Sequence, residues 1–189
     1  LILVSRDGQA VRFTATDEQL RSMGRSTSGV RGMKFRGDDE LLSMEVPHEG
    51  TDLLIVTDSG YAKRTPVEEY PTKSRGTLGV RVGKLVDERG GLVGALVVRP
   101  DEDVMVITSS GKLVQVNASD VRPTARNTMG VIFARPDEGD RIIAITRNPE
   151  SGDDEESETP EADSPSGEDT PSGEDSPTEG GAGVNTTEK

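Results

Sequence analysis

A six-residue pattern, Arg-x-Thr-x-Gly-Val, occurs three times in this chain at almost constant spacing. The copies begin at Arg25, Arg75 and Arg126, which are 50 and 51 residues apart. Turns that end in glycine keep nearly the same period, and they end at Gly8, Gly60 and Gly111. Self-similarity with a period near 50 residues is typical of a repeat protein, in which one supersecondary unit is stacked several times. No other feature of the sequence restricts the fold so strongly.

Each repeat has the pattern of four short β-strands. In the middle repeat, an apolar β-branched run at 53–57 and a turn precede a hairpin partner at 61–65. Further strands are predicted at 80–86 and 92–98. The other two repeats follow the same plan, with matching segments at 1–5, 9–13, 41–46, 104–108, 112–116 and 141–146. We therefore expect an all-β fold of propeller-like blades, each built from four antiparallel strands.

Two local patterns add detail to this plan. The glycines of the hexapeptide, Gly29, Gly79 and Gly130, are expected where φ is positive or where two backbones approach closely. The segment 65–68, Thr-Pro-Val-Glu, has the form of a capping box with proline at the first helical position. It predicts a single helical turn.

Charge divides the chain into two domains. Residues 150–189 hold fourteen acidic residues and one lysine, whereas residues 1–149 hold 21 residues of each sign. The acidic segment is rich in Pro, Gly, Ser and Thr and has few apolar residues, so we expect a disordered tail. The folded body is therefore expected at residues 1–149, and the low overall pI does not argue against nucleic-acid binding by this body.

The repeated arginine is the strongest functional signal. A guanidinium group matches phosphate in bidentate fashion, and three copies in phase would form a line of positive charge along stacked repeats. The alternative is a solvated turn in which the threonines cap their own loops. The predicted DNA-binding residues are Arg21, Arg25, Arg31, Lys63, Arg64, Lys73, Arg75, Arg81, Arg122 and Arg126.

The scarcity of aromatic residues indicates which nucleic acid would bind. The chain has two Tyr, three Phe and no Trp, which is too few for the stacking platforms that hold single strands. Double-stranded DNA, bound through its backbone, fits better. A protein-interaction propeller is the alternative from another functional class, but propeller repeats of that kind depend on aromatic signatures.

Catalytic and metal chemistry find no candidates in this segment. One histidine, His48, and no cysteine exclude Ser-His-Asp and Cys-His nucleophile systems and thiolate metal sites. The run 79–84 is similar to a phosphate-binding loop, but Leu85 stands where that loop needs Ser or Thr. No apolar run approaches the roughly 18 residues of a membrane-spanning helix. We expect no catalytic residue, bound cofactor or metal here.

Residues 52–70, together with the hexapeptide at 75–80, resemble the C-terminal domain of the A subunit of bacterial DNA gyrase. The resemblance covers all three repeats, residues 1–149. It implies a six-bladed β-pinwheel that wraps double-stranded DNA around a basic rim, with the last three blades present here. An acidic tail after the last blade also fits this family.

The same resemblance implies the remaining functional expectations. The whole enzyme would be an ATP-dependent type II topoisomerase that introduces negative supercoils, as an A2B2 complex with the gyrase B protein and a second copy of the A protein. ATP and Mg²⁺ would bind on the B protein and the catalytic core, and the location would be the bacterial cytoplasm, at the nucleoid. The family's Gln-Arg-Arg-Gly-Gly-x-Gly box is not found in this sequence. For that reason the corresponding domain of topoisomerase IV, a close relative, stays an alternative.

Overall fold

The computed structural model describes residues 1–148. The first repeat contains β1 (Ile2–Ser5), β2 (Gln9–Arg12) and β3 (Leu41–Glu45). The middle repeat contains β4 (Asp52–Thr57), β5 (Tyr61–Pro66), β6 (Val80–Arg81) and β7 (Leu92–Val98). The last repeat contains β8 (Asp103–Thr108), β9 (Leu113–Asn117), β10 (Val131–Ile132) and β11 (Ile142–Arg147). The predicted disordered tail, residues 150–189, lies outside the described residues.

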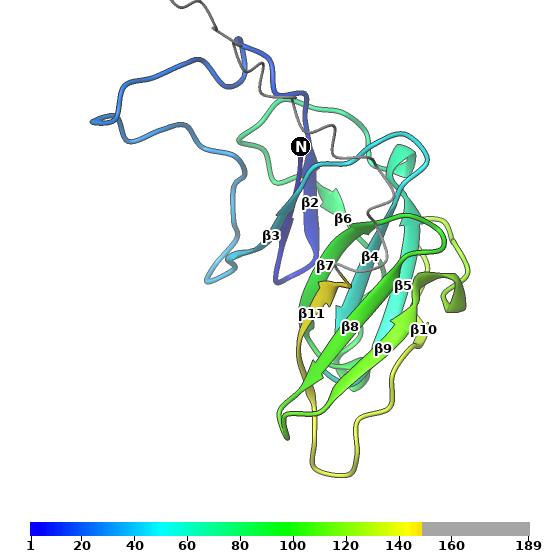
Figure 1. Cartoon of the computed structure of the whole chain (residues 1–189). Helices are drawn as coiled ribbons and strands as arrows, with labels where there is room; N and C mark the ends of the chain where they lie inside the picture. The colour runs from blue at the N-terminus through cyan, green and yellow to red at the C-terminus, as the bar shows by residue number, and fades with distance from the viewer. Residues whose placement is uncertain (149–189) are drawn as a thin grey trace, which may run out of the picture. The chain divides into compact units, whose positions relative to one another are not determined.

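The strands form three antiparallel sheets that lie one after another along the described chain (Figure 1). The first sheet has the order β3-β1-β2-β6, the second β10-β5-β4-β7, and the third β11-β8-β9. The all-β prediction is therefore confirmed, and most predicted strands lie within a residue or two of the observed ones.

The third strand of a repeat does not pair within its own repeat, which corrects the expectation of blades built from a single unit. β6 belongs to the middle repeat but pairs with β2 of the first, with Ala10 opposite Val80. β10 likewise crosses from the last repeat to β5, with Ala62 opposite Val131. Each of these strands spans only two residues, so the predicted strand at 80–86 is also too long. Neighbouring repeats are thus joined by main-chain hydrogen bonds.

The hexapeptide glycine permits this exchange. A Cβ atom at position 79 would lie 2.0 Å from the carbonyl oxygen of Ala10, and φ of Gly79 is +76°. A Cβ atom at position 130 would lie 2.5 Å from the carbonyl oxygen of Ala62. Gly29 has φ +76° but no neighbour within 4 Å of a Cβ atom. The prediction of positive φ or close backbone approach is confirmed at all three positions.

The predicted helical turn is present as a 3-10 turn, η1 (Val67–Glu69), but its cap differs from the prediction. Pro66 occupies the N-cap position and no side chain caps the turn, so the expected capping box does not form. Two further 3-10 turns are η2 (Asp87–Arg89) and η3 (Ala118–Asp120). In η3 the Asn117 side chain accepts a hydrogen bond from the Ser119 amide.

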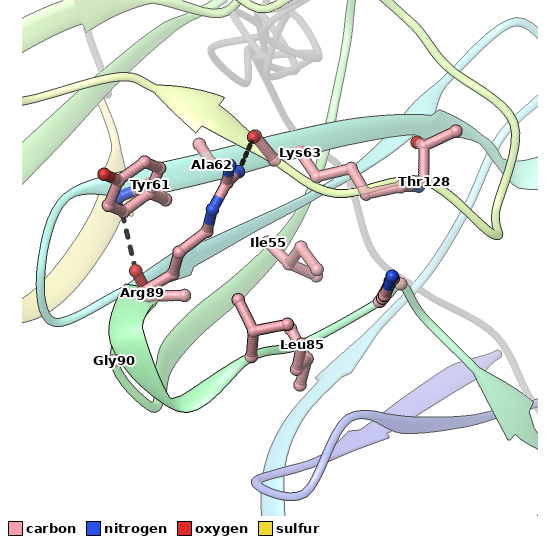
Figure 2. A pocket seen from close by; sticks show the side chains of 13 residues that line it. Ile55, Tyr61, Ala62, Lys63, Leu85, Arg89, Gly90 and Thr128 are labelled. Carbon is pink, nitrogen blue, oxygen red and sulfur yellow. Dashed lines mark hydrogen bonds between the residues drawn. The ribbon is translucent and has the colours of Figure 1, made fainter.

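Lys63 and Arg64 are buried in β5, with 3% and 5% of their surface exposed, so neither side chain reaches the solvent-facing surface. Lys63 donates to the Thr65 hydroxyl and lies beside Thr128 at a small cavity (Figure 2). Arg64 lies 3.3 Å from the Asp52 carboxylate and donates to the Pro100 carbonyl at 2.8 Å. The structure thus gives both residues internal partners, and their predicted DNA contact is not carried further.

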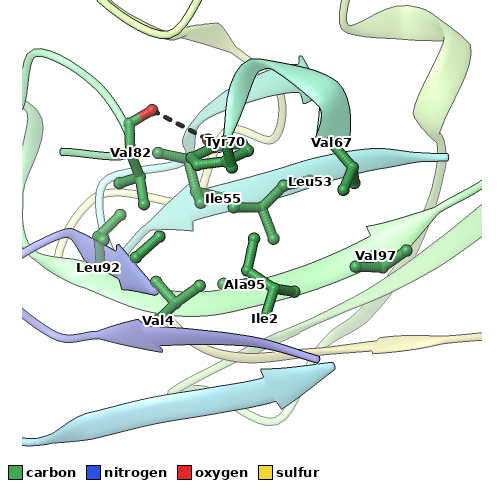
Figure 3. Close-up of a cluster of buried hydrophobic side chains, with 11 residues drawn as sticks. Ile2, Val4, Leu53, Ile55, Val67, Tyr70, Val82, Leu92, Ala95 and Val97 are labelled. Atoms are coloured by element: carbon green, nitrogen blue, oxygen red, sulfur yellow. Dashed lines mark hydrogen bonds between the residues drawn. The ribbon is translucent and has the colours of Figure 1, made fainter. Parts of the chain in front are cut away.

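Apolar side chains fill the spaces between successive sheets. The first cluster lies between the first and second sheets and includes Ile2, Val4, Leu53, Ile55 and Val97 (Figure 3). The second lies between the second and third sheets and includes Leu54, Val56, Val98, Val104 and Val106. Because neighbouring residues of β4 point to opposite faces, this strand contributes to both clusters. The second sheet is therefore covered on both faces, which is why β5 buries even its cations.

Replacing Gly79 with Ala tests the close approach between repeats. Gly50 is a matched control, since its φ of +75° is similar and no atom lies within 4 Å of its Cβ position. Both variants carry the strain of a left-handed alanine, but only Gly79→Ala collides with a backbone oxygen. We expect Gly79→Ala to lose about 2 kcal/mol more unfolding free energy than Gly50→Ala in urea denaturation. Equal losses would show that the strands are not packed this closely.

The buried amine predicts a pH-dependent stability. Burial lowers the pKa of Lys63 from 10.5 to about 8, opposed by Glu69 and assisted by the positive charge of Arg126. Between these pH values the unfolded chain binds the additional proton, so stability rises with pH. From about pH 7 to about pH 9.5 we expect the parent chain to gain about 1–2 kcal/mol relative to Lys63→Met. Urea denaturation at both pH values measures this difference, and parallel pH profiles would contradict it.

Candidate nucleic-acid interface

The three hexapeptide loops follow one another along the same edge of the sheets. The middle loop lies against the second strand of the first repeat, where the Lys73 amide donates to the Arg12 carbonyl at 2.8 Å. The last loop repeats this contact one unit later, where the Thr124 amide donates to the Arg64 carbonyl at 2.9 Å. The exchanged strands then extend each loop along the edge of the preceding sheet.

The hexapeptide arginines join each loop to the loop before it. Arg75 Nε donates to the Gln19 carbonyl, and its Nη1 donates to the Arg31 carbonyl at 3.2 Å. Arg126 Nη1 donates to the Arg81 carbonyl at 3.3 Å, in the same position of its repeat. Each contact brings two arginines of successive loops together. The periodic arginine therefore has a structural role that its spacing alone did not predict.

The threonines of the hexapeptide bond within their own loops. Thr27 Oγ1 donates to the Gly24 carbonyl at 2.8 Å, and Thr128 Oγ1 donates to the Ala125 carbonyl at 2.9 Å. Thr77 makes the corresponding contact at 3.5 Å. Of the two roles open to these residues in the sequence, loop closure is the one observed.

Most of the predicted loop cations are exposed and have no acidic partner. Arg75 and Arg126 are half-buried because of their contacts with carbonyl groups. The exposed ones are Arg21, Arg25, Arg31, Lys73, Arg81 and Arg122. None of these six takes part in an ion pair within residues 1–148. Their positive charge is therefore available to an external anion.

Three further cations lie in phase and were missed by the sequence analysis. Lys34, Lys84 and Arg135 each stand five positions after the hexapeptide glycine, and all three are exposed. The Lys34 amide donates to the Thr77 carbonyl at 2.8 Å, and the Lys84 amide to the Thr128 carbonyl at 3.0 Å. Two of them are thus held directly beside the next loop. Their common offset in the repeat is the sequence signal that could have identified them.

We call the set of loop cations the cationic line. It offers neighbouring, uncompensated guanidinium and ammonium groups along an edge more than one repeat long, an arrangement suited to the backbone of a nucleic acid. Its members are Arg21, Arg25, Arg31, Lys34, Lys73, Arg75, Arg81, Lys84, Arg122, Arg126 and Arg135.

The cavity at Lys63 does not suit a substrate. Its volume is about 20 Å³, and Ile55, Ala62 and Leu85 supply part of its lining (Figure 2). A space of that size holds about one water molecule. In residues 1–148 no group of three or more His, Cys, Asp or Glu side chains could hold a metal ion. The same part of the chain has no helix long and apolar enough to cross a membrane.

Comparison with known proteins agrees with the repeat boundaries. A family model described as the DNA gyrase C-terminal domain, beta-propeller, matches residues 1–48, 51–99 and 102–149. Each match covers one complete repeat, including its hexapeptide.

Curated relatives give the same result. The A protein of DNA gyrase from Mycobacterium tuberculosis is 52% identical over 155 residues, which cover 82% of this chain and 18% of that protein. The A protein of DNA gyrase from Streptomyces coelicolor is 49% identical over 152 residues, covering 80% and 18%. The chain therefore spans less than a fifth of the length of these relatives.

Among solved structures, a DNA gyrase A C-terminal domain matches with a TM-score of 0.70 and 26% identity, covering 77% of this chain and 49% of that domain. A C-terminal domain of DNA topoisomerase IV also has a TM-score of 0.70 but only 20% identity, and shares the fold. The three family matches and the relatives near 50% identity favour gyrase over topoisomerase IV, and the chain belongs to the DNA gyrase C-terminal domain family.

Proposed function

We propose that residues 1–149 bind the phosphate backbone of double-stranded DNA along the cationic line and guide the duplex around the stacked repeats, as the DNA-wrapping segment of a gyrase A protein. The observation that carries this proposal is the contact of Arg75 and Arg126 with the preceding loops. These contacts bring cations of successive repeats together without intervening carboxylates.

The arginines of the line divide into two roles. Arg75 uses Nε and Nη1 for carbonyl groups of the first loop, so its main task is to position that loop. Exposed neighbours such as Arg31 and Arg81 contribute only their backbone carbonyls to these contacts. Their guanidinium groups are free to bind phosphate, and sequence readout is expected to be weak because such contacts do not reach base edges.

The aromatic residues favour a duplex over a single strand. Phe13 and Tyr70 are buried in the core, and Tyr61 lies under the Arg89 guanidinium, 4.7 Å from the ring centroid. Phe35 alone among the five aromatic side chains of residues 1–148 is exposed. One exposed ring does not provide the successive stacking positions of a single-strand groove.

The wider activity follows from the family. The relatives are A proteins of DNA gyrase, and this chain matches 18% of their length. We propose that it acts within such a protein, in an A2B2 complex with the gyrase B protein that uses ATP and Mg²⁺ bound elsewhere to introduce negative supercoils. This work would take place in the bacterial cytoplasm, on nucleoid DNA.

The salt dependence of DNA binding tests the cationic line. We expect the full chain to bind a duplex more tightly than a single strand of the same length. For every phosphate contact that a substitution removes, the slope of log affinity against log salt should become shallower by about 0.9. The triple variant Arg25→Ala, Arg31→Ala, Arg81→Ala should therefore reduce the duplex slope by about 2.7. Fluorescence anisotropy between about 50 and 300 mM salt measures it.

The control removes two exposed cations outside the line. Arg6 is paired with Glu40 and Lys112 with Asp137, so Arg6→Ala with Lys112→Ala should leave the slope nearly unchanged. An unchanged slope in the triple variant would remove the line from the DNA footprint. Equal reductions in both variants would indicate a general effect of net charge.

The acidic tail is expected to compete with DNA for the cationic line. Residues 150–189 carry fourteen carboxylates and one lysine, and a tethered polyanion acts at high effective concentration. Deleting them should tighten duplex binding roughly 3- to 10-fold at about 50 mM salt, with a smaller effect at about 300 mM. A tail of equal length with Asn and Gln in place of Asp and Glu should behave like the deletion. An affinity unaltered at every salt concentration would refute competition.

A further inference from the structure

The edge of β9 lacks the strand that completes the other two sheets. β2 pairs with β6 and β5 pairs with β10, whereas the third sheet ends at β9 within the described residues. Leu113 is 60% exposed, whereas the equivalent residues of the completed sheets, Ala10 and Ala62, are 1% and 2% exposed. The edge therefore presents unpaired main-chain groups next to exposed apolar side chains, which is a template for strand addition.

The first repeat holds a matching segment that pairs with no strand in residues 1–148. Val30 and Arg31 occupy the positions of the exchanged strands β6 and β10, directly after the hexapeptide glycine. Gly29 has φ +76°, the value found at Gly79, where the exchange is made. A Cβ atom at Gly29 would have no neighbour within 4 Å. The segment thus already has the backbone conformation needed for pairing, while its partner position is empty.

We propose that Val30–Arg31 of one copy of this chain adds to the open edge of β9 in a second copy, head to tail. The register of the two internal exchanges places Val30 opposite Leu113 and Arg31 opposite Lys112. The first pair brings two apolar side chains together. In the second, the charge of Lys112 is offset by its ion pair with Asp137. Gly29 would then lie on the Leu113 carbonyl, as Gly79 lies on that of Ala10.

Two such contacts close a dimer. Each copy has one free strand and one open edge, so a head-to-tail pair can satisfy both if the rotation between copies closes. This chain covers 49% of the solved gyrase A C-terminal domain, so two copies supply the number of repeats in one such domain. The geometry points to a ring of six repeats. The inference depends only on the strand exchange and not on DNA binding.

Sedimentation equilibrium of the full chain tests the dimer. The chain mass is 20.1 kDa, and we expect a concentration-dependent increase to twice that mass. Salt at about 300 mM screens repulsion between the acidic segments. Gly29→Ala places a methyl group where the Leu113 carbonyl would approach, so it should weaken the dimer at least tenfold. Gly50→Ala carries the same φ strain at +75° with no neighbour within 4 Å and should dimerise like the parent chain.

A second variant tests the acceptor edge. Leu113→Lys adds a cation opposite Val30 at an exposed position, so it should also weaken self-association by at least tenfold while urea denaturation stays close to that of the parent. Mixing this variant with Gly29→Ala should restore one contact per pair, because each supplies the element that the other lacks. Monomers at every concentration would overturn the proposal. Association that survives both substitutions would overturn it as well.

Discussion

The structure depends on one close approach between backbones of successive repeats. At Gly79 and Gly130 the chain passes so near a carbonyl oxygen of the preceding hairpin that no side chain fits. The following two residues then complete the preceding sheet with main-chain hydrogen bonds. Apolar packing alone would allow the sheets to slide or rotate, since the hydrophobic effect is not directional. The exchanged strand fixes their register.

The periodicity of charge is a consequence of this exchange. Since the loop before each exchanged strand must cross to the preceding repeat, it always arrives at the same edge. Arg75 and Arg126 stabilise that crossing by donating to carbonyl groups of the loop they meet. A side chain that maintains the geometry of the repeat is therefore also the one that brings cations of adjacent loops together. Fold and charge arrangement arise from the same contacts.

Periodicity and turn chemistry were sufficient to predict the strands and the special glycines. They could not predict the exchange, because a two-residue strand such as Val80–Arg81 carries no pattern that identifies its partner. The candidate site was predicted in part for a similar reason. Lys63 and Arg64 lie in a strand covered on both faces, and burial on both sides depends on the stacking of sheets rather than on local sequence. Lys34 and Lys84 had a visible signal in their common offset from the hexapeptide.

The neutral body is strongly divided in how its charges are used. Acidic side chains pair with cations of the hairpins and outer strands, as in Arg6 with Glu40 and Lys112 with Asp137. Inside, Arg64 pairs with Asp52, whose pKa is raised by burial and lowered again by that arginine. Since these pairs involve few of the basic residues, most of the remaining positive charge lies on the crossing loops. A body with equal numbers of acidic and basic residues can therefore present one edge to a polyanion, because placement rather than net charge determines the local field.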